Sequence, residues 1–244
     1  MEDEVPGGAA AKRTILCYGD SNTWGSVPGL VKRRFPIHTR WPGAMSKLLR
    51  ADYRVLEEGL CGRTTVFDDP IEGAFGVDKN GFRLLGSVLA SHAPLDLVII
   101  MLGTNDLKYR FSAAPGDIAD GVGALVERTR SSEFGPGFQK PPETLIVCPP
   151  AIWEVESAFG PAFKGGQEKS LALPAAFGKM TDKVGVPLLY AEDFIQSDPA
   201  DGIHLSAESH GILAQELVRR VLERFGGDMG TRNTGRLPET RAMA

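Results

Sequence analysis

Cysteine is scarce in this chain, which argues against a cysteine zinc site and against a fold stabilised by disulfides. Only three of the 244 residues are cysteines, Cys17, Cys61 and Cys148, and their spacing is not that of a zinc site. The first residues, MEDEVPGGAAAK, are acidic and contain no apolar segment, so they do not resemble a secretory signal. An odd number of thiols without such a signal predicts reduced cysteines in a cytoplasmic protein.

Long apolar runs and an excess of positive charge are also missing. No apolar run approaches the ~20 residues that cross a bilayer, so we expect no membrane partner. The net charge of −4 offers no basic surface for nucleic acid. No glycine-rich phosphate loop is present either, which disfavours a nucleotide-binding module. The remaining composition is that of an ordinary globular protein with enough apolar residues for a large core.

Apolar segments alternate with amphipathic segments about five times along the chain. The apolar segments predict strands at residues 14–18, 53–60, 95–102, 144–148 and 186–190. The amphipathic segments predict helices at residues 41–50, 82–91, 115–130, 168–184 (bent near Pro174) and 206–225. This alternation is typical of a doubly wound α/β domain, with a parallel sheet inside and helices on both faces.

The domain is expected to span residues 12–225. We expect a flexible leader at residues 1–11 and a disordered tail at residues 226–244, where the apolar pattern stops. Three long loops are expected at residues 26–39, 66–81 and 151–166. The basic run at residues 32–34 in the first of them is interpreted as a solvated face.

The first predicted strand runs into the sequence Gly19-Asp20-Ser21. Glycine gives the backbone the freedom for a tight exit from a strand. Ser21 would then lie just past the carboxyl end of a central strand, where ligands bind in open α/β sheets. A hydroxyl at this edge is well placed for nucleophilic attack. The alternative is that Asp20 or Ser21 only caps a helix.

Three further motifs follow predicted strands or precede the last helix. They are residues 59–62 (GLCG), 103–106 (GTND) and 201–204 (DGIH). A parallel sheet would bring residues 59–62 and 103–106 to the edge that holds Ser21, and residues 201–204 can reach the same edge. We therefore expect the four motifs to form one site.

The residue types in these motifs are those that acyl transfer requires. His204 can accept the proton of the Ser21 hydroxyl, and Asp201 can fix the imidazole tautomer and stabilise the imidazolium. Candidate oxyanion donors are the backbone N–H groups of Ser21 and Gly62 and the side-chain amide of Asn105. Each of these residues also has a purely structural alternative. His204 could cap a helix, Asp201 could be an acidic residue that the dipole favours at a helix N-terminus, and Asn105 could be a turn residue.

Other polar residues near these motifs have alternative roles. Asp20 and Asp106 are interpreted as structural residues that make turn hydrogen bonds. One alternative is a metal-dependent phosphodiesterase that uses Asp20, Asp201 and His204. Asp201 and His204 by themselves are too few ligands for a metal site. We therefore expect no metal and no cofactor. Cys61 is a rival nucleophile without an apparent base.

Substrate contacts are predicted from residues beside the catalytic positions and from aromatic residues near strand ends. Trp24, Thr104, Trp153 and Ile203 are the candidates for lining the substrate pocket. Core packing is the alternative for Trp24. Trp153 lies in an irregular stretch after a strand end, where an aromatic side chain could form a channel or a subunit contact.

Four of these residues resemble the markers of a known family. Ser21, Gly62, Asn105 and His204 resemble the four marker residues of the SGNH (GDSL-type) serine hydrolases, over about residues 12–225. The segments GDSNTWG, EEGLCGRTT, LDLVIIMLGTND and DGIHLS are most similar to the small bacterial aryl esterase/acyltransferase branch. Cys61 departs from that branch, which has a small hydroxyl residue there.

The resemblance implies a flavodoxin-like fold and a serine esterase. Its substrates would be small-molecule short-chain aryl, alkyl or carbohydrate esters, cleaved through an acyl-enzyme, with acyl transfer to alcohols or peroxide. It also implies a homo-oligomer. The alternatives are a lysophospholipase or thioesterase of the same family, or a flavodoxin-like binding module without catalysis.

Overall fold

The computed structural model describes residues 12–71 and 77–226. The expected leader at residues 1–11 lies outside the described residues, as does the expected tail from residue 227 onward. No helix in the described part of the chain is long and apolar enough to cross a membrane.

Five parallel strands form one sheet with the order β2-β1-β3-β4-β5. The strands are β1 (Arg13–Gly19), β2 (Tyr53–Gly59), β3 (Leu97–Met101), β4 (Glu143–Cys148) and β5 (Leu188–Tyr190). This order is the doubly wound order of flavodoxin-like folds, so the predicted fold class is confirmed. Gly19 pairs with Gly59 on one side and Met101 on the other, which places the loops after β1, β2 and β3 at one edge.

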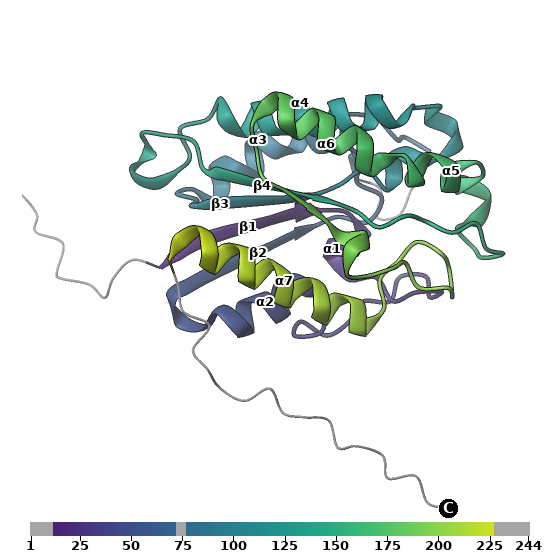
Figure 1. Cartoon of the computed structure of the whole chain (residues 1–244), viewed down its shortest axis with the longest axis horizontal. Coiled ribbons are helices and arrows are strands. Elements are labelled where there is room, and N and C mark those ends of the chain that lie inside the picture. Colours follow the sequence, from purple (N-terminus) through teal and green to yellow (C-terminus); the bar gives the residue numbers. More distant parts are fainter. Residues whose placement is uncertain (1–11, 72–76, 227–244) are drawn as a thin grey trace, which may run out of the picture.

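Helices cover both faces of the sheet (Figure 1). One face carries α3 (Gly81–His92), α4 (Pro115–Arg130) and α6 (Leu173–Val184), and the other carries α2 (Trp41–Leu49) and α7 (Ala207–Phe225). Side chains of β1 alternate between the two cores. Leu16 and Tyr18 pack under the first group, and Ile15 and Cys17 under the second. Burial on both faces explains why the strands are apolar throughout.

The predicted boundaries mostly agree with the structure, with two differences. A four-residue helix, α1 (Ser21–Trp24), begins where only a turn was expected. The helix expected at residues 168–184 is two helices, α5 (Gly166–Leu171) and α6, because the chain breaks at Ala172. Pro174 lies in the first turn of α6, a position where its missing N–H costs nothing.

Short 3₁₀ helices occupy parts of the loops. They are η1 (Arg50–Asp52), η3 (Asn105–Leu107), η4 (Tyr109–Phe111), η5 (Pro136–Phe138), η6 (Gly160–Phe163) and η7 (Ala191–Asp193). η3 contains Asn105 and Asp106 directly after β3, so both side chains start from the edge of the sheet that holds the β1 and β2 loops.

Candidate active site

The turn after β1 places the Ser21 hydroxyl at the sheet edge. The Asp20 carboxylate accepts a hydrogen bond from the backbone N–H of Asn22 at 2.9 Å and caps α1, and Ser21 is the first residue of that helix. The capping alternative for Asp20 is therefore correct, and it is compatible with a functional Ser21. Gly19 is required here, because a Cβ atom on it would lie 2.0 Å from Thr23 Oγ1.

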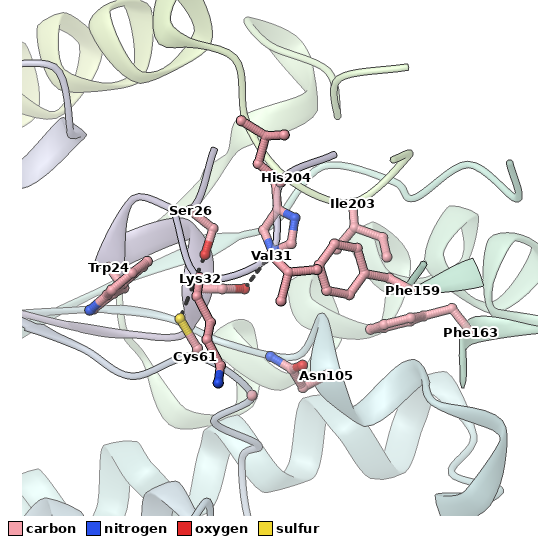
Figure 2. Close-up of a pocket in the computed structure, with 13 residues that line it drawn as sticks. Trp24, Ser26, Val31, Lys32, Cys61, Asn105, Phe159, Phe163, Ile203 and His204 are labelled. Carbon is pink, nitrogen blue, oxygen red and sulfur yellow. Dashed lines mark hydrogen bonds between the residues drawn. The ribbon is translucent and has the colours of Figure 1, made fainter. Parts of the chain in front are cut away.

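The structure brings together the serine, histidine and aspartate selected from the sequence. His204 Nε2 lies 3.0 Å from Ser21 Oγ, although the two residues are 183 positions apart. His204 Nδ1 lies 2.7 Å from Asp201 Oδ2. Ser21 and His204 are 7% and 6% exposed, so their contact is largely shielded from water. The imidazole points into a pocket in front of the sheet edge (Figure 2).

Asp201 is held as a carboxylate by several donors. Its Oδ1 accepts the backbone N–H groups of Ile203 and His204, both at 2.9 Å. Its Oδ2 accepts the Gly29 N–H at 2.8 Å in addition to the imidazole. Burial alone would raise the pKa of Asp201, but the hydrogen bonds and charge of His204 outweigh it and lower the pKa to about 2.

Asn22 fixes the segment that carries His204 against α1. Its side-chain amide donates to the Ile203 carbonyl at 3.2 Å, and its side-chain oxygen accepts the Leu205 N–H at 3.0 Å. The ring of Phe159 meets the His204 ring edge-on, with centroids 5.2 Å apart. Asn22 thus fixes the backbone on both sides of His204, and Phe159 contacts its ring. Sequence reasoning missed Asn22 because nothing in GDSN signals a partner 181 residues away.

The three candidate oxyanion donors surround the same space. Gly62 has φ of +82°, a conformation that favours glycine, and lines the pocket with Ser21 and Asn105. Asn105 Nδ2 donates to the Arg63 carbonyl at 3.1 Å and lies 3.4 Å from Asp20 Oδ2. The amide is therefore oriented before any substrate arrives.

Arg63 is buried at the junction of the loops after β1 and β2. Its guanidinium donates to the Gly19 carbonyl at 2.9 Å and to the Glu58 carbonyl. It also lies 4.0 Å from the centroid of the Tyr18 ring. Burial lowers the pKa of Arg63. The sequence analysis did not select Arg63, because its partners are backbone carbonyls that no motif reveals.

Asp106 is structural, but its hydrogen bonds are not those of a local turn. Its carboxylate accepts the backbone N–H of Thr65 at 3.0 Å and the Thr65 hydroxyl, across 41 residues. Burial raises the pKa of Asp106 to about 6 and that of Asp20 to about 6. Both carboxyl groups therefore connect loops at the sheet edge rather than enter the pocket.

Comparison with known proteins identifies the family. A sequence model of the GDSL-like Lipase/Acylhydrolase family matches residues 17–212. The chain belongs to this family. The SGNH resemblance, the esterase prediction and the similarity to the aryl esterase branch are thereby confirmed. No curated protein matched the chain.

Solved structures of acetylesterases and aryl esterases are similar to this acylhydrolase. Est24, a carbohydrate acetylesterase from Sinorhizobium meliloti, is 42% identical with a TM-score of 0.81, covering 88% of this chain and all of its own. The M. smegmatis aryl esterase is 40% identical with a TM-score of 0.81, covering 86% and 99%. Another carbohydrate acetylesterase family member from S. meliloti is 36% identical with a TM-score of 0.81, covering 88% and 99%.

The pocket of the acylhydrolase is lined by polar groups, among them His204 and Asn105, and by apolar side chains, among them Phe159 and Phe163 (Figure 2). Its lining residues are Ser21, Trp24, Ser26, Leu30, Val31, Lys32, Cys61, Gly62, Asn105, Phe159, Phe163, Ile203 and His204. Residues of two of the three long loops, 26–39 and 151–166, thus meet over the sheet edge, and no described residue of the loop at 66–81 lines the pocket. Loop conformation, which the sequence pattern does not fix, decides the shape of the pocket.

Two of the four predicted substrate contacts lie in this pocket and two do not. Trp24 and Ile203 line it. Thr104 is buried at the start of η3 and does not line the pocket, so that prediction is corrected. Trp153 is also outside the lining, so that prediction is corrected as well; its backbone N–H pairs with the Gly202 carbonyl at 2.8 Å, and its side chain is 37% exposed.

The surroundings of Cys61 and of the candidate metal ligands bear on the two alternative chemistries. Cys61 Sγ lies 3.6 Å from Ser26 Oγ, and burial raises the pKa of the thiol, which disfavours a reactive thiolate. Within residues 12–71 and 77–226, no group of three or more histidine, cysteine, aspartate or glutamate side chains is arranged to hold a metal ion.

Proposed function

We propose that this GDSL-family acylhydrolase cleaves short-chain, acetyl-type esters through an acyl-enzyme on Ser21. The observation that carries the proposal is the chain of contacts from Ser21 Oγ through His204 to Asp201, at 3.0 and 2.7 Å. A nucleophile within hydrogen-bond reach of a base, which is itself oriented by a carboxylate, is the arrangement that nucleophilic catalysis needs.

The first half of the reaction forms the acyl-enzyme. His204 Nε2 takes the proton of Ser21 as Oγ attacks the ester carbonyl, and Asp201 stabilises the resulting imidazolium. The carbonyl oxygen becomes an oxyanion that accepts hydrogen bonds from the N–H groups of Ser21 and Gly62 and from the Asn105 amide. The C–O bond to the alcohol then breaks, and the alcohol leaves with the proton from His204.

The second half returns the enzyme to its starting state. Water attacks the acyl carbonyl after giving a proton to His204, and the acid leaves as Ser21 Oγ recovers that proton. An alcohol or peroxide that replaces water at this step yields a new ester or a peracid. The apolar side chains of Trp24, Phe159 and Phe163 around the pocket favour an alcohol with an apolar substituent over water.

The proposed substrate class rests on the residues that line the pocket and on the names of the similar structures. The printed names of the similar structures are carbohydrate acetylesterase and aryl esterase. Trp24, Ser26 and Cys61 line the same pocket as Ser21, and the proposal places a small acyl group among these side chains. A lysophospholipase or thioesterase would need room for a long acyl chain. Since the chain belongs to an acylhydrolase family, a binding module without catalysis is set aside.

The test is labelling and turnover with matched serine variants. A fluorophosphonate should label one site, Ser21, and Ser21→Ala should abolish both labelling and hydrolysis of 4-nitrophenyl acetate. Ser26→Ala, which removes a pocket hydroxyl 3.6 Å from Cys61, should still be labelled. Persistent turnover in Ser21→Ala would refute the proposal.

An acyl-chain series from acetyl to octanoyl esters tests the substrate class. Rates should fall steeply with length, and acetylated sugars should be cleaved. A preference for octanoyl esters would favour the lysophospholipase or thioesterase alternative. Activity that is lost with EDTA would instead favour a metal-dependent phosphodiesterase.

The homo-oligomer and the cytoplasmic location stay predictions. Light scattering coupled to size exclusion would test the first, and fractionation of cells would test the second.

A further inference from the structure

We propose that Lys32 makes the pocket selective for esters whose alcohol part carries a carboxylate; this inference rests on the proposed function. The sequence analysis interpreted residues 32–34 as a solvated face. The structure instead places Lys32 among the residues that line the pocket of Ser21. Its side chain extends across the pocket in Figure 2, and in that view its ammonium group ends between Cys61 and Asn105.

The loop of residues 26–34 is anchored, so it holds Lys32 over the pocket. Ser26 and Arg34 form an antiparallel bridge at its two ends. Inside the loop, the Gly29 N–H donates to Asp201 Oδ2 at 2.8 Å. Lys32 itself has φ of +57°, a strained conformation that a lysine rarely adopts. Such strain persists only where the surroundings fix it, and it is concentrated at ligand-binding sites.

Lys32 differs from the neighbouring cation Arg34 in its charge partners. Arg34 pairs with the Glu57 carboxylate at 3.2 Å and donates to the Trp24 carbonyl at 2.6 Å. Among residues 12–71 and 77–226, Lys32 has no hydrogen bond or ion pair, and no carboxylate side chain lines the pocket. An ammonium group without a counter-ion at the rim of an apolar pocket attracts an anionic group on the substrate.

The position of Lys32 assigns that anion to the alcohol part. Leu30, Val31 and Lys32 are the exposed, outer part of the lining, whereas Ser21 and Asn105 are buried at its base. A short acyl group next to Ser21 stays at the base. The alcohol oxygen must reach His204 Nε2 to receive a proton, so the rest of the alcohol extends outward past the 26–34 loop.

The experiment compares matched pairs of esters in the full-length enzyme. 4-Acetoxybenzoate and its methyl ester differ in charge on the alcohol part, whereas monomethyl and dimethyl succinate differ on the acyl part. For the first pair, the ratio of kcat/KM for the charged to the neutral ester should fall about tenfold in Lys32→Gln and further in Lys32→Glu. Because each ratio is compared with that of the wild type, the intrinsic reactivities of the esters cancel.

Arg33→Gln is the control, since it removes a neighbouring charge that does not line the pocket, and it should keep the wild-type ratio. The preference of the wild type should also weaken with salt, because the Lys32 end of the pocket is exposed to solvent. An unchanged ratio in both Lys32 variants would overturn the inference, as would an effect confined to the succinate pair. Turnover of the neutral acetate by the wild type, with none by Ser21→Ala, would show that the proposed function itself survives.

Discussion

The backbone carbonyl of Arg63 accepts a hydrogen bond from the Asn105 side-chain amide at 3.1 Å. This contact joins the loop after β2 to the loop after β3. The Arg63 guanidinium binds the Gly19 carbonyl at 2.9 Å, so the same residue also connects the loop that carries Ser21. One buried arginine therefore bridges the three loops that supply the candidate oxyanion donors.

Replacing Arg63 should affect kcat more than KM. Arg63→Met removes the donors to Gly19 and Glu58 and lets the donor loops shift. A misplacement of about 1 Å can cost about 10²-fold in rate, so we expect kcat to fall about 10- to 10²-fold and Arg63→Lys to restore part of it. Steady-state kinetics with 4-nitrophenyl acetate measure both constants.

The control for Arg63 is Arg54→Met, an exposed change on β2, the strand that precedes the Arg63 loop, which should keep wild-type kinetics. If Arg63→Met lowers only the thermal midpoint and leaves kcat intact, Arg63 serves stability alone.

Removing the charge of Asp201 should cost far more than removing a neighbouring carboxylate. Asp201→Asn keeps the size of the side chain but takes away the anion that faces His204 Nδ1 at 2.7 Å. From the serine-protease precedent we expect kcat to fall about 10³- to 10⁴-fold with the fold retained. Asp198→Asn is the matched change in the same turn, where Asp198 accepts the Ala200 N–H at 2.9 Å. Comparable losses in the two variants would contradict the role of Asp201.

Asn22→Ala should lower both stability and rate. The substitution leaves the buried Leu205 N–H without its acceptor, which costs about 1–3 kcal/mol. The substitution also loosens the segment that carries His204, so we expect kcat, calculated per folded enzyme, to fall. Urea unfolding and steady-state kinetics measure the two effects. Unchanged stability would show that water replaces the lost hydrogen bonds.

His210 should make the stability of the fold sensitive to acid. Burial lowers its pKa to about 3, and its Nδ1 faces the Trp41 N–H at 3.3 Å. The unfolded chain binds this proton below about pH 6.5, whereas the folded chain binds it only near pH 3. The contribution of His210 is therefore complete above pH 6.5 and decreases as the pH falls toward 3, by up to about 1.4 kcal/mol per pH unit.

Urea unfolding between pH 4.5 and 7.5 checks this by comparison with His210→Gln, which keeps an acceptor but does not titrate. The comparison is needed because Asp20 and Asp106, with pKa values raised to about 6, act in the opposite direction. The variant should lose less stability on acidification than the wild type. The exposed His38→Gln should behave like the wild type. Parallel curves for His210→Gln and the wild type would rule out His210 as the source.

The sequence predicted the sheet and the site for a physical reason. Parallel strands buried on both faces are continuous apolar runs, as in residues 95–102, and the motifs follow those runs directly. The topology then brings Ser21 and His204 together across 183 residues. The residue types in the motifs and the order of the strands were therefore enough to predict this part of the site.

The parts that could not be predicted depend on contacts between distant segments. Arg63 and Asn22 act through backbone carbonyls and N–H groups, which leave no mark on side-chain pattern. α1 has only four residues, too few to show a helical period. Thr104 belongs to one motif and Trp153 contacts another through its backbone, yet neither lines the pocket, because loop conformation decides which residues near a motif face the substrate.

The hydrogen bond from Gly29 to Asp201 links the entrance of the pocket to its chemistry. The loop that the substrate must pass also supplies a donor to the carboxylate behind the imidazole. Insertions or deletions that widen the entrance will therefore change the hydrogen bonding of the Asp201 carboxylate together with access. Redesign of this acylhydrolase for bulkier esters is better directed at side chains such as Val31 than at the backbone of the loop.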